Sequence, residues 1–231
     1  MDRQRTGEIL RGNPWFRGLP PALARAILAH GEICDFPDGS RIYGEQDLPD
    51  GLYAVLEGEV RLILHAEDGR QVLFKLCRPG SWFGEVSMFD GLPRLQNAEA
   101  VGPVRLLRLG NAPFAEIVGG EPAAWRFFAQ ILTRHLREAL AYIVDSQLQA
   151  LPARLARRLL TLARPGEDGA IRIRLTQEEI AAMMGVSRQT LNRVLNDWKR
   201  QGILRLDYAH VTVTDPAALA RVVGPARRSG G

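Results

Sequence analysis

The sequence predicts an α+β protein in which an antiparallel β domain precedes one long helix and a helical C-terminal part. Three observations support this prediction. Short apolar runs alternate with turn signals from Ile33 to Leu109. A stretch near residues 122–149 has no glycine, and no proline after Pro122. A capped pair of helices then occupies residues 177–201. A chain of 231 residues is expected to form more than one domain.

The N-terminal part begins with a short amphipathic helix over residues 20–30, which Gly31 closes. Beyond it, runs such as LYAVLEGEVRLIL and QVLFKLC are separated by the turn signals PDGS, EDGR, RPGS and FDGLP. Turn signals at this spacing are typical of a compact antiparallel sandwich or barrel. The EDG segment, residues 67–69, predicts a hairpin between its two neighbouring runs.

The long helix carries a heptad seam, because its apolar or small residues recur at alternating spacings of four and three. The seam predicts a dimer interface made by Trp125, Ala129, Leu132, Leu136, Ala139 and Ile143, with Ser146 continuing the spacing. A second stripe, Phe128, Ile131 and Leu140, could instead pack the helix on its own β domain. Two usable stripes on one helix favour dimerisation through the seam.

The C-terminal part is expected to contain a helix, a strand pair, two further helices and a terminal hairpin. Their expected places are 152–163, 171–175, 177–184, 188–201 and the segment GILRLDYAHVTVTD. The predicted domains are a β domain over 1–120, the dimerisation helix over 121–149, a DNA-binding domain over 150–222 and a disordered tail over 223–231.

Charge is distributed unevenly along the chain. Residues 150–231 carry 14 Lys and Arg against 7 Asp and Glu, whereas residues 1–149 carry 16 against 19. A basic segment on a mildly acidic body is what contact with nucleic acid needs, since backbone phosphates supply most of the non-specific attraction.

Several classes of protein are disfavoured. The two cysteines, Cys34 and Cys77, have no CxxC spacing, so neither a metal site nor an iron–sulfur cluster is expected. No apolar run approaches the ~18 residues of a membrane span, and no signal-peptide core is present, so we expect a cytoplasmic protein. Glu85 has no nucleophile or metal cluster beside it in the sequence, and we expect no enzyme activity.

The strongest motif is LTQEEIAAMMGVSRQTLNRVLNDWKRQGIL. Thr176 and Glu179 form a capping box that opens a helix. Gly185 ends that helix and permits a tight turn, and Ser187 is a suitable N-cap for the next helix. This arrangement is a helix-turn-helix.

The second helix of this motif has an apolar face and a polar face. Leu191, Val194, Leu195 and Trp198 form the apolar face. The opposite face offers Arg188, Gln189, Asn192 and Arg193, which can read base edges, while Ser187 and Thr190 can contact backbone phosphates. We therefore expect double-stranded DNA as the partner.

The order of β domain, seam helix and GVSRQTLNRVL resembles the CRP/FNR family of bacterial transcription regulators, that of the cAMP receptor protein, from about residue 12 to residue 220. The resemblance implies a jelly-roll effector domain, a coiled-coil dimer helix and a winged helix-turn-helix that binds a palindromic operator. It makes GILRLDYAHVTV the wing and RNA polymerase a partner.

The resemblance also implies an effector pocket in FGEVSMFDGLPRLQNAEA. Gly84, Glu85 and Val86 match the start of the short helix whose N–H groups face a cyclic phosphate, with Trp82–Phe83 as sheet residues before them. Glu85 would accept from a ribose hydroxyl, and Arg94 would pair with the phosphate.

The pattern then departs from that of cAMP binders. Leu95 replaces the usual Ser or Thr, and the two adenine-contacting positions of the dimer helix fall on Ala139 and Leu140. Losing several polar contacts of about 0.5–1.5 kcal/mol each should weaken cAMP binding by orders of magnitude. Three interpretations stay open: an internal Glu85–Arg94 ion pair in an empty pocket, another small anionic effector, or cAMP itself.

Other sensing chemistries are no better supported by the sequence. A haem sensor would need an axial ligand, a lone histidine is more often a core or surface residue, and of His30, His65, His135 and His210 only His135, on the dimer helix, would merit a test. A small-molecule sensor that acts mainly through protein contacts is the alternative of another class. Gln189 stands where many relatives have Glu, so the operator is expected to depart from the TGTGA half-site at one base pair.

Overall fold

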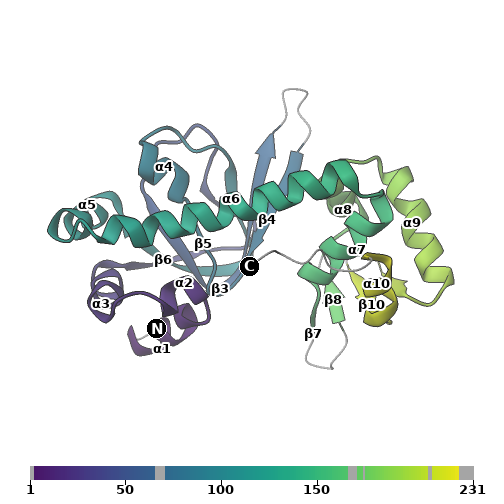
Figure 1. Cartoon of the computed structure of the whole chain (residues 1–231), viewed down its shortest axis with the longest axis horizontal. Helices are drawn as coiled ribbons and strands as arrows, with labels where there is room; N and C mark the ends of the chain where they lie inside the picture. The colour runs from purple at the N-terminus through teal and green to yellow at the C-terminus, as the bar shows by residue number, and fades with distance from the viewer. Residues whose placement is uncertain (1–2, 66–70, 166–170, 174, 208–209, 224–231) are drawn as a thin grey trace. The chain divides into compact units, whose positions relative to one another are not determined.

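The structure is a computed structural model that describes residues 3–65, 71–165, 171–173, 175–207 and 210–223 (Figure 1). It forms two compact units, residues 1–138 and 139–231. The boundary between them falls inside the longest helix, and the predicted domain limits near 120 and 150 stay predictions.

The first unit begins with three helices, continues as a sheet and ends in further helices. The first helices are α1 Arg3–Arg11, α2 Pro14–Arg17 and α3 Pro21–His30. The strands are β1 Glu32–Phe36, β2 Arg41–Tyr43, β3 Gly51–His65, β4 Gln71–Cys77, β5 Trp82–Phe83 and β6 Asn97–Gly110. Helix α4, Glu85–Asp90, lies between β5 and β6, and α5 Asn111–Gly120 and α6 Ala124–Leu148 follow.

The sheet of the first unit is antiparallel, as predicted. Its main path runs β1-β6-β3-β4, with β2 on β6 and β5 on β3. The register of β3 against β4 confirms the predicted hairpin, with His65 opposite Gln71, although the turn residues 66–70 lie outside the described residues. Strand β3 bends at Gly58, whose φ is 78° and where a Cβ would meet the Pro103 carbonyl oxygen at 2.4 Å. Only glycine fits that bend.

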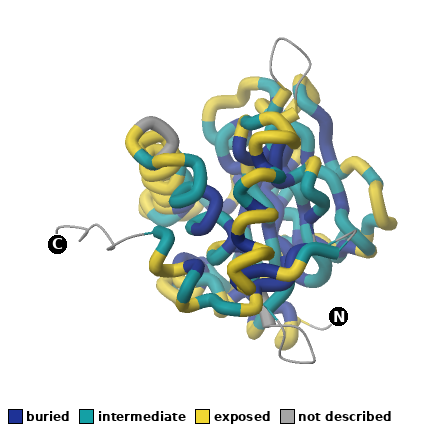
Figure 2. Tube along the Cα trace, turned by 90° about the vertical axis from the view of Figure 1, so that its right-hand side faces the viewer, coloured by how far each residue is buried: buried dark blue, intermediate teal, exposed yellow. Residues whose placement is uncertain are grey.

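The buried residues of the first unit form two clusters. Figure 2 shows how far each described residue of the chain is buried. One cluster lies within the sheet and includes Val55, Val60 and Leu106. The other joins the sheet to the helices, where Trp15 packs edge-on against Trp82 with ring centroids 5.1 Å apart. The Trp15 indole N–H also donates to the Phe127 carbonyl at 2.6 Å, so α6 is tied to the N-terminal helices by a hydrogen bond as well as by packing.

Helix α6 packs on its own sheet through part of its predicted second stripe. Phe128 and Ile131 are buried in the cluster that joins sheet and helices, which leaves the seam outside that contact. Leu136 is 55% exposed and Ile143 is 48% exposed. Leu140, assigned to the packing stripe from the sequence, is exposed instead.

One seam residue has contacts within its own unit. The ring of Trp125 meets Phe114 edge-on at 5.3 Å and Phe89 at 5.8 Å, although 41% of the residue stays exposed. Trp125 therefore serves partly to pack the start of α6 on α4 and α5. The end of α3 also differs from a glycine cap, since Gly31 has an extended φ of −73°.

The second unit contains the predicted helix pair and a small sheet. Its helices after α6 are α7 Leu151–Leu162, α8 Gln177–Met184, α9 Arg188–Arg200 and α10 Pro216–Val223. Its strands are β7 Arg164–Pro165, β8 Ile171–Ile173, β9 Leu204–Leu206 and β10 Val211–Val213, in the order β7-β8-β10-β9. The antiparallel pair β9–β10 confirms the predicted terminal hairpin.

The sequence did not predict α10, whose Leu219 is fully buried. Val223, the first residue of the predicted tail, is the last residue of this helix. The rest of that tail, 224–231, lies outside the described residues. None of the helices within the described ranges is long and apolar enough to cross a membrane.

Candidate functional site

The turn between α8 and α9 is built by the residues that the sequence indicated. The Thr176 hydroxyl accepts from the Glu179 N–H at 3.2 Å, and the Thr176 N–H donates to the Glu179 carboxylate at 2.7 Å, which completes the capping box. Gly185 ends α8 with a left-handed φ of 64°, and Ser187 caps α9. The helix-turn-helix is thereby fixed by local hydrogen bonds.

Helix α9 buries one face and exposes the other. Leu191, Leu195 and Trp198 are buried, as the sequence predicted. Arg188, Gln189 and Arg193 are exposed, and within the described part of the chain no hydrogen bond or ion pair engages their side chains. Three groups that can read bases are therefore free for a partner.

The remaining predicted residues of α9 have partners or are partly buried. The hydroxyls of Ser187 and Thr190 lie 2.9 Å apart, and Ser187 also accepts from the Thr190 N–H at 3.1 Å. Asn192 is half-buried, and its Oδ1 is buried without a partner among the described residues. Ser187 thus acts first as a helix cap, and Asn192 faces less toward solvent than its neighbours.

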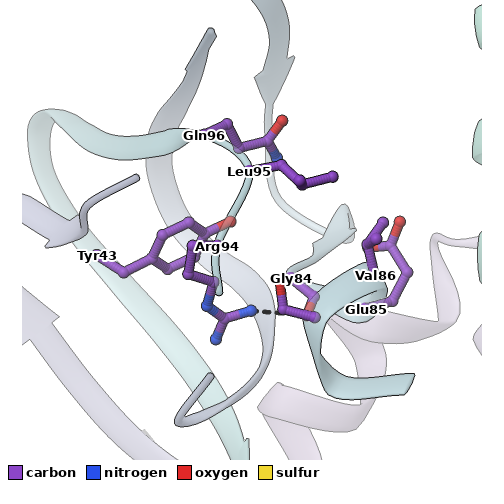
Figure 3. Close-up of a pocket in the computed structure, with 8 residues that line it drawn as sticks. Tyr43, Gly84, Glu85, Val86, Arg94, Leu95 and Gln96 are labelled. Carbon is purple, nitrogen blue, oxygen red and sulfur yellow. Dashed lines mark hydrogen bonds between the residues drawn. The ribbon is translucent and has the colours of Figure 1, made fainter. Parts of the chain in front are cut away.

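The first unit holds a small pocket between β2, α4 and the segment before β6 (Figure 3). Its cavity measures about 40 Å³ and is lined by Tyr43, Gly84, Glu85, Val86, Ser87, Arg94, Leu95 and Gln96. All five candidates from the sequence line it. Tyr43, Ser87 and Gln96 were not foreseen.

Arg94 is the centre of this pocket and is almost fully buried. Its Nη1 donates to the Gly84 carbonyl at 2.7 Å, and its Nη2 donates to the Gly51 carbonyl at 2.7 Å and to the Asp50 carboxylate at 2.9 Å. The guanidinium also stacks 4.3 Å from the centroid of the Tyr43 ring. Its Nε is buried with no partner among the described residues.

These contacts correct one interpretation of the sequence. The internal Glu85–Arg94 ion pair is not formed, because Asp50 is the carboxylate that pairs with Arg94. Glu85, itself 5% exposed, bonds His135 of α6 through its Oε1, at 2.7 Å from the imidazole Nδ1. Glu85 and Arg94 lie close together in the sequence, which suggested that they pair with each other. Arg94 instead pairs with Asp50, 44 positions away, and Glu85 with His135, 50 positions away.

The backbone around Arg94 is constrained. Gly84 has a φ of 89°, and a Cβ there would lie 2.9 Å from the Arg94 Nη1, so a side chain would disturb the guanidinium. The Arg94 N–H donates to the Asp47 carbonyl, and the Arg94 carbonyl accepts from Gln46, which has an unusual φ of 70°. Leu95 points outward, with 57% exposed.

Two tyrosines near Arg94 stay protonated at neutral pH. Burial raises the pKa of Tyr43 far above its ordinary value, although the charge of Arg94 opposes this. Burial also raises the pKa of Tyr53, and the hydrogen bond from its hydroxyl to Asp50 raises it further. Tyr43, the one of the two that lines the pocket, therefore offers a hydroxyl dipole rather than a phenolate charge.

Two family models match the chain. The cyclic nucleotide-binding domain matches residues 33–120, and the Crp-like helix-turn-helix domain matches residues 153–222. A CRP-like cAMP-activated global transcriptional regulator of Mycobacterium tuberculosis is 33% identical over 219 residues, which cover 93% of this chain and 98% of the relative. The chain belongs to the CRP/FNR family.

Further members of the CRP/FNR family extend this similarity. The cyclic AMP receptor protein of Thermus thermophilus is 32% identical over 92% of this chain and 98% of its own length. The crystal structure of a CRP/FNR-family transcriptional regulator from Thermus thermophilus superposes with a TM-score of 0.71 at 33% identity, covering 84% of this chain and 99% of that chain.

This CRP/FNR-family chain is a transcription regulator with a helix-turn-helix DNA-binding domain and a cyclic nucleotide-binding domain, and the family is not one of enzymes. Both the predicted fold class and the predicted family are confirmed. No sequence signal pointed to Asp50, which follows an ordinary turn, whereas His135 had been singled out only as a haem ligand.

Proposed function

We propose that the chain acts as a homodimer that binds a palindromic operator. The observation that carries this proposal is the exposed seam of α6, where Leu136 and Ile143 leave about half of their surface uncovered. Large apolar side chains spaced along one helix at alternating threes and fours are the pattern by which a second identical helix packs. A twofold dimer reads two half-sites, so its operator is a palindrome.

The dimer is tested by sedimentation velocity of the full chain over a dilution series. We expect a dimer at micromolar concentration that contains Ala129, Leu132 and Ala139 in its interface besides the two exposed residues. A monomer at all concentrations would contradict the proposal.

Base recognition is assigned to the exposed face of α9. Arg188, Gln189 and Arg193 reach toward base edges in the major groove, and Asn192 contributes if its amide turns outward. Ser187 and Thr190 at the helix start contact backbone phosphates and set the register. The absence of internal partners for the first three side chains in the described residues supports this assignment.

The effector proposed for the pocket is a small anion of the cyclic-nucleotide class, with cAMP itself binding weakly. The match to the cyclic nucleotide-binding domain and the two relatives whose names mention cAMP support the class. Leu95 offers no hydroxyl, and an incoming phosphate must compete with Asp50 for Arg94. Both features lower the affinity expected for cAMP.

Calorimetric titration of cAMP, then cGMP, into the full chain tests the effector. We expect no saturable heat at micromolar nucleotide from the wild type. Asp50→Asn removes the competing charge, and its tighter binding than the wild type would support competition at Arg94. Micromolar binding of cAMP to the wild type would contradict this account of the pocket.

The regulator is further proposed to act in the bacterial cytoplasm, where its operator lies, and to contact RNA polymerase when bound there. The family of transcription regulators supports both statements. Operator position relative to the promoter then decides between activation and repression.

A further inference from the structure

Three histidines within the described ranges each lie at hydrogen-bond distance from a carboxylate. His65 pairs with Glu45 and His210 with Asp207, both at 3.0 Å, and each of these four side chains is about one-third exposed. The third pair differs. In it, the Glu85 side chain is 6% exposed, the His135 side chain is 19% exposed and the atoms are 2.7 Å apart.

The Glu85 carboxylate depends on His135 for its charge compensation. Arg94, the nearest candidate in the sequence, is committed to Asp50 and to two backbone carbonyls. Among the described residues, His135 is the only group that bonds the Glu85 side chain. A buried carboxylate is costly without a partner, so the Glu85 carboxylate relies on the hydrogen bond with His135.

The other charged groups near His135 lie on α6 itself and on β4. Glu138, one turn beyond His135, bonds Lys75 of β4 at 3.0 Å and Arg134 at 3.3 Å. Burial raises the pKa of Glu138, but Lys75, His135 and Arg134 together outweigh that effect and leave it below its ordinary value. Glu138 is therefore ionised throughout the neutral range.

The remaining titratable neighbours of Glu85 stay neutral in that range. Burial raises the pKa of Cys77, on β4, to about 12. Burial likewise raises the pKa of Tyr43, on β2, against the opposing charge of Arg94. Histidine is the side chain whose charge ordinarily changes between pH 5 and 8. His135 is the histidine of this cluster, and its Nδ1 lies 2.7 Å from the Glu85 carboxylate.

Polar contacts of described residues join α6 to other elements of the first unit. Trp15 donates to the Phe127 carbonyl, Arg134 donates to Asn13, Lys75 pairs with Glu138, and Glu85 bonds His135. Of these contacts, only that between Glu85 and His135 involves a residue that lines the effector pocket. It also lies next to the seam, between Leu132 and Leu136.

We propose that His135 is the positioning residue of Glu85 and makes the attachment of the dimer helix to the effector pocket dependent on pH. This inference depends on the proposed dimer, and it makes protonation a regulator of dimerisation. Protonated His135 makes a charge-assisted bond to the Glu85 carboxylate and fixes α6 against α4. Neutral His135 makes a weaker bond and leaves this part of α6 less firmly held.

The sign of the effect follows from the pairing. A histidine that gains a carboxylate partner on folding stabilises the paired arrangement at low pH and loses that contribution as the pH rises. The seam is therefore better ordered, and the dimer tighter, on the acidic side of neutrality. A charge-assisted bond exceeds a neutral one by roughly the free energy of a three- to tenfold change in an equilibrium constant.

The first test is sedimentation velocity of the full chain at about pH 6 and about pH 8. We expect the wild-type dimer to be about three- to tenfold tighter at the lower pH. His135→Arg, a permanent cation, should keep the tight dimer at both values, and His135→Gln should give the weaker dimer at both. His65→Gln, in the exposed pair, is the matched control and should retain the wild-type dependence.

Some outcomes of this test would overturn the proposal. A pH-independent wild-type dimer would do so, and so would a pH dependence that survives in His135→Gln or disappears equally in His65→Gln. A chain that is monomeric at every concentration would contradict the proposed dimer instead, and the second test then decides about His135.

The second test follows the imidazole carbon resonances of the full chain by NMR during a pH titration, with the His135 signal identified by its loss in His135→Gln. In the wild type this signal should respond to pH differently from the signal in Glu85→Gln, which keeps the shape but removes the charge. Glu45→Gln should leave the His135 signal unaltered. An identical titration in wild type and Glu85→Gln would overturn the proposal whatever the oligomeric state.

Discussion

The arginines of the recognition helix and the arginine of the pocket are placed in opposite ways. Arg188 and Arg193 of α9 are exposed, and no described side chain pairs with them. Arg94 is 1% exposed and has a carboxylate, two carbonyls and an aromatic face around it. Arg188 and Arg193 can therefore bind an external partner directly, whereas Arg94 is already bonded within the protein.

Because of this difference, the residues of α9 indicate a binding partner directly, whereas those of the pocket do not. A free cationic face on a capped helix is suited to DNA, whose phosphates and guanines accept from arginine. A buried arginine whose two terminal nitrogens already donate within the protein stabilises the fold first, and these nitrogens bind a ligand only by exchanging those partners. The same residue type therefore indicates binding in one unit and stability in the other.

The largest effect should come from removing the internal arginine. Arg94→Ala leaves the Gly84 and Gly51 carbonyls without their donor, and each unsatisfied buried group costs about 1–3 kcal/mol in the free energy of unfolding. Asp50, whose side chain is 44% exposed, keeps the Tyr53 hydroxyl as a donor. Chemical denaturation of the full chain measures this. Arg200→Ala, which removes a highly exposed arginine paired with Asp197, should change it by less than about 1 kcal/mol. Equal free energies of unfolding for Arg94→Ala and Arg200→Ala would contradict the contrast between buried and exposed arginines.

The next effect concerns the seam of α6. Leu136→Glu places a charge at an exposed apolar position, so the fold of the chain should persist while the dimer dissociation constant rises by about 100-fold. Sedimentation velocity measures this change. Gln130→Glu puts the same charge on an exposed position of α6 outside the seam and should leave the constant within about threefold. A dimer equally weakened by both variants would place the interface elsewhere.

Removing one base-reading side chain should have a moderate effect. Arg188→Ala is expected to cost about 1–3 kcal/mol in operator binding and to relax specificity at one base pair. Fluorescence anisotropy with single-base operator variants measures both. A uniform loss over all sequences would assign Arg188 to a phosphate. Lys199→Ala, in the last turn of α9, should not change base preference at any position.

The smallest predicted effect is local to the helix-turn-helix. Thr176→Ala removes the hydroxyl that caps α8 and should lower the stability of the second unit by about 1 kcal/mol. Denaturation followed by far-ultraviolet circular dichroism measures it. Thr161→Ala, whose hydroxyl bonds the Arg157 carbonyl within α7, should lower stability by less than about 0.5 kcal/mol. A loss as large in Thr161→Ala would show that the cap has no special role.

The sequence allowed the fold to be predicted where local rules decide it. Turn residues separated the strands, Thr176 and Glu179 opened α8, and the absence of glycine and proline marked α6. Each of these signals acts within a few residues. Helix α10 was missed because its packing through Leu219, and not a strong local pattern, secures it.

The pocket could be predicted only in part, because its decisive contacts are long-range. Spacing brought Glu85 and Arg94 together as candidates, and both do line the same cavity. Their partners come from elsewhere, Asp50 from the start of β3 and His135 from α6. Those pairings depend on how β3 and α6 pack beside α4, which no single segment of the sequence encodes.

The most direct test of DNA reading by α9 is selection of binding sites by the full chain from random duplex DNA. We expect palindromic sites with two half-sites about 10–10.5 base pairs apart, centre to centre, or a multiple of that distance, which depart from TGTGA at the base pair read by Gln189. Plain TGTGA palindromes would contradict the role given to Gln189. Weak, salt-sensitive binding with no enriched sequence would contradict the central claim that the exposed face of α9 reads DNA.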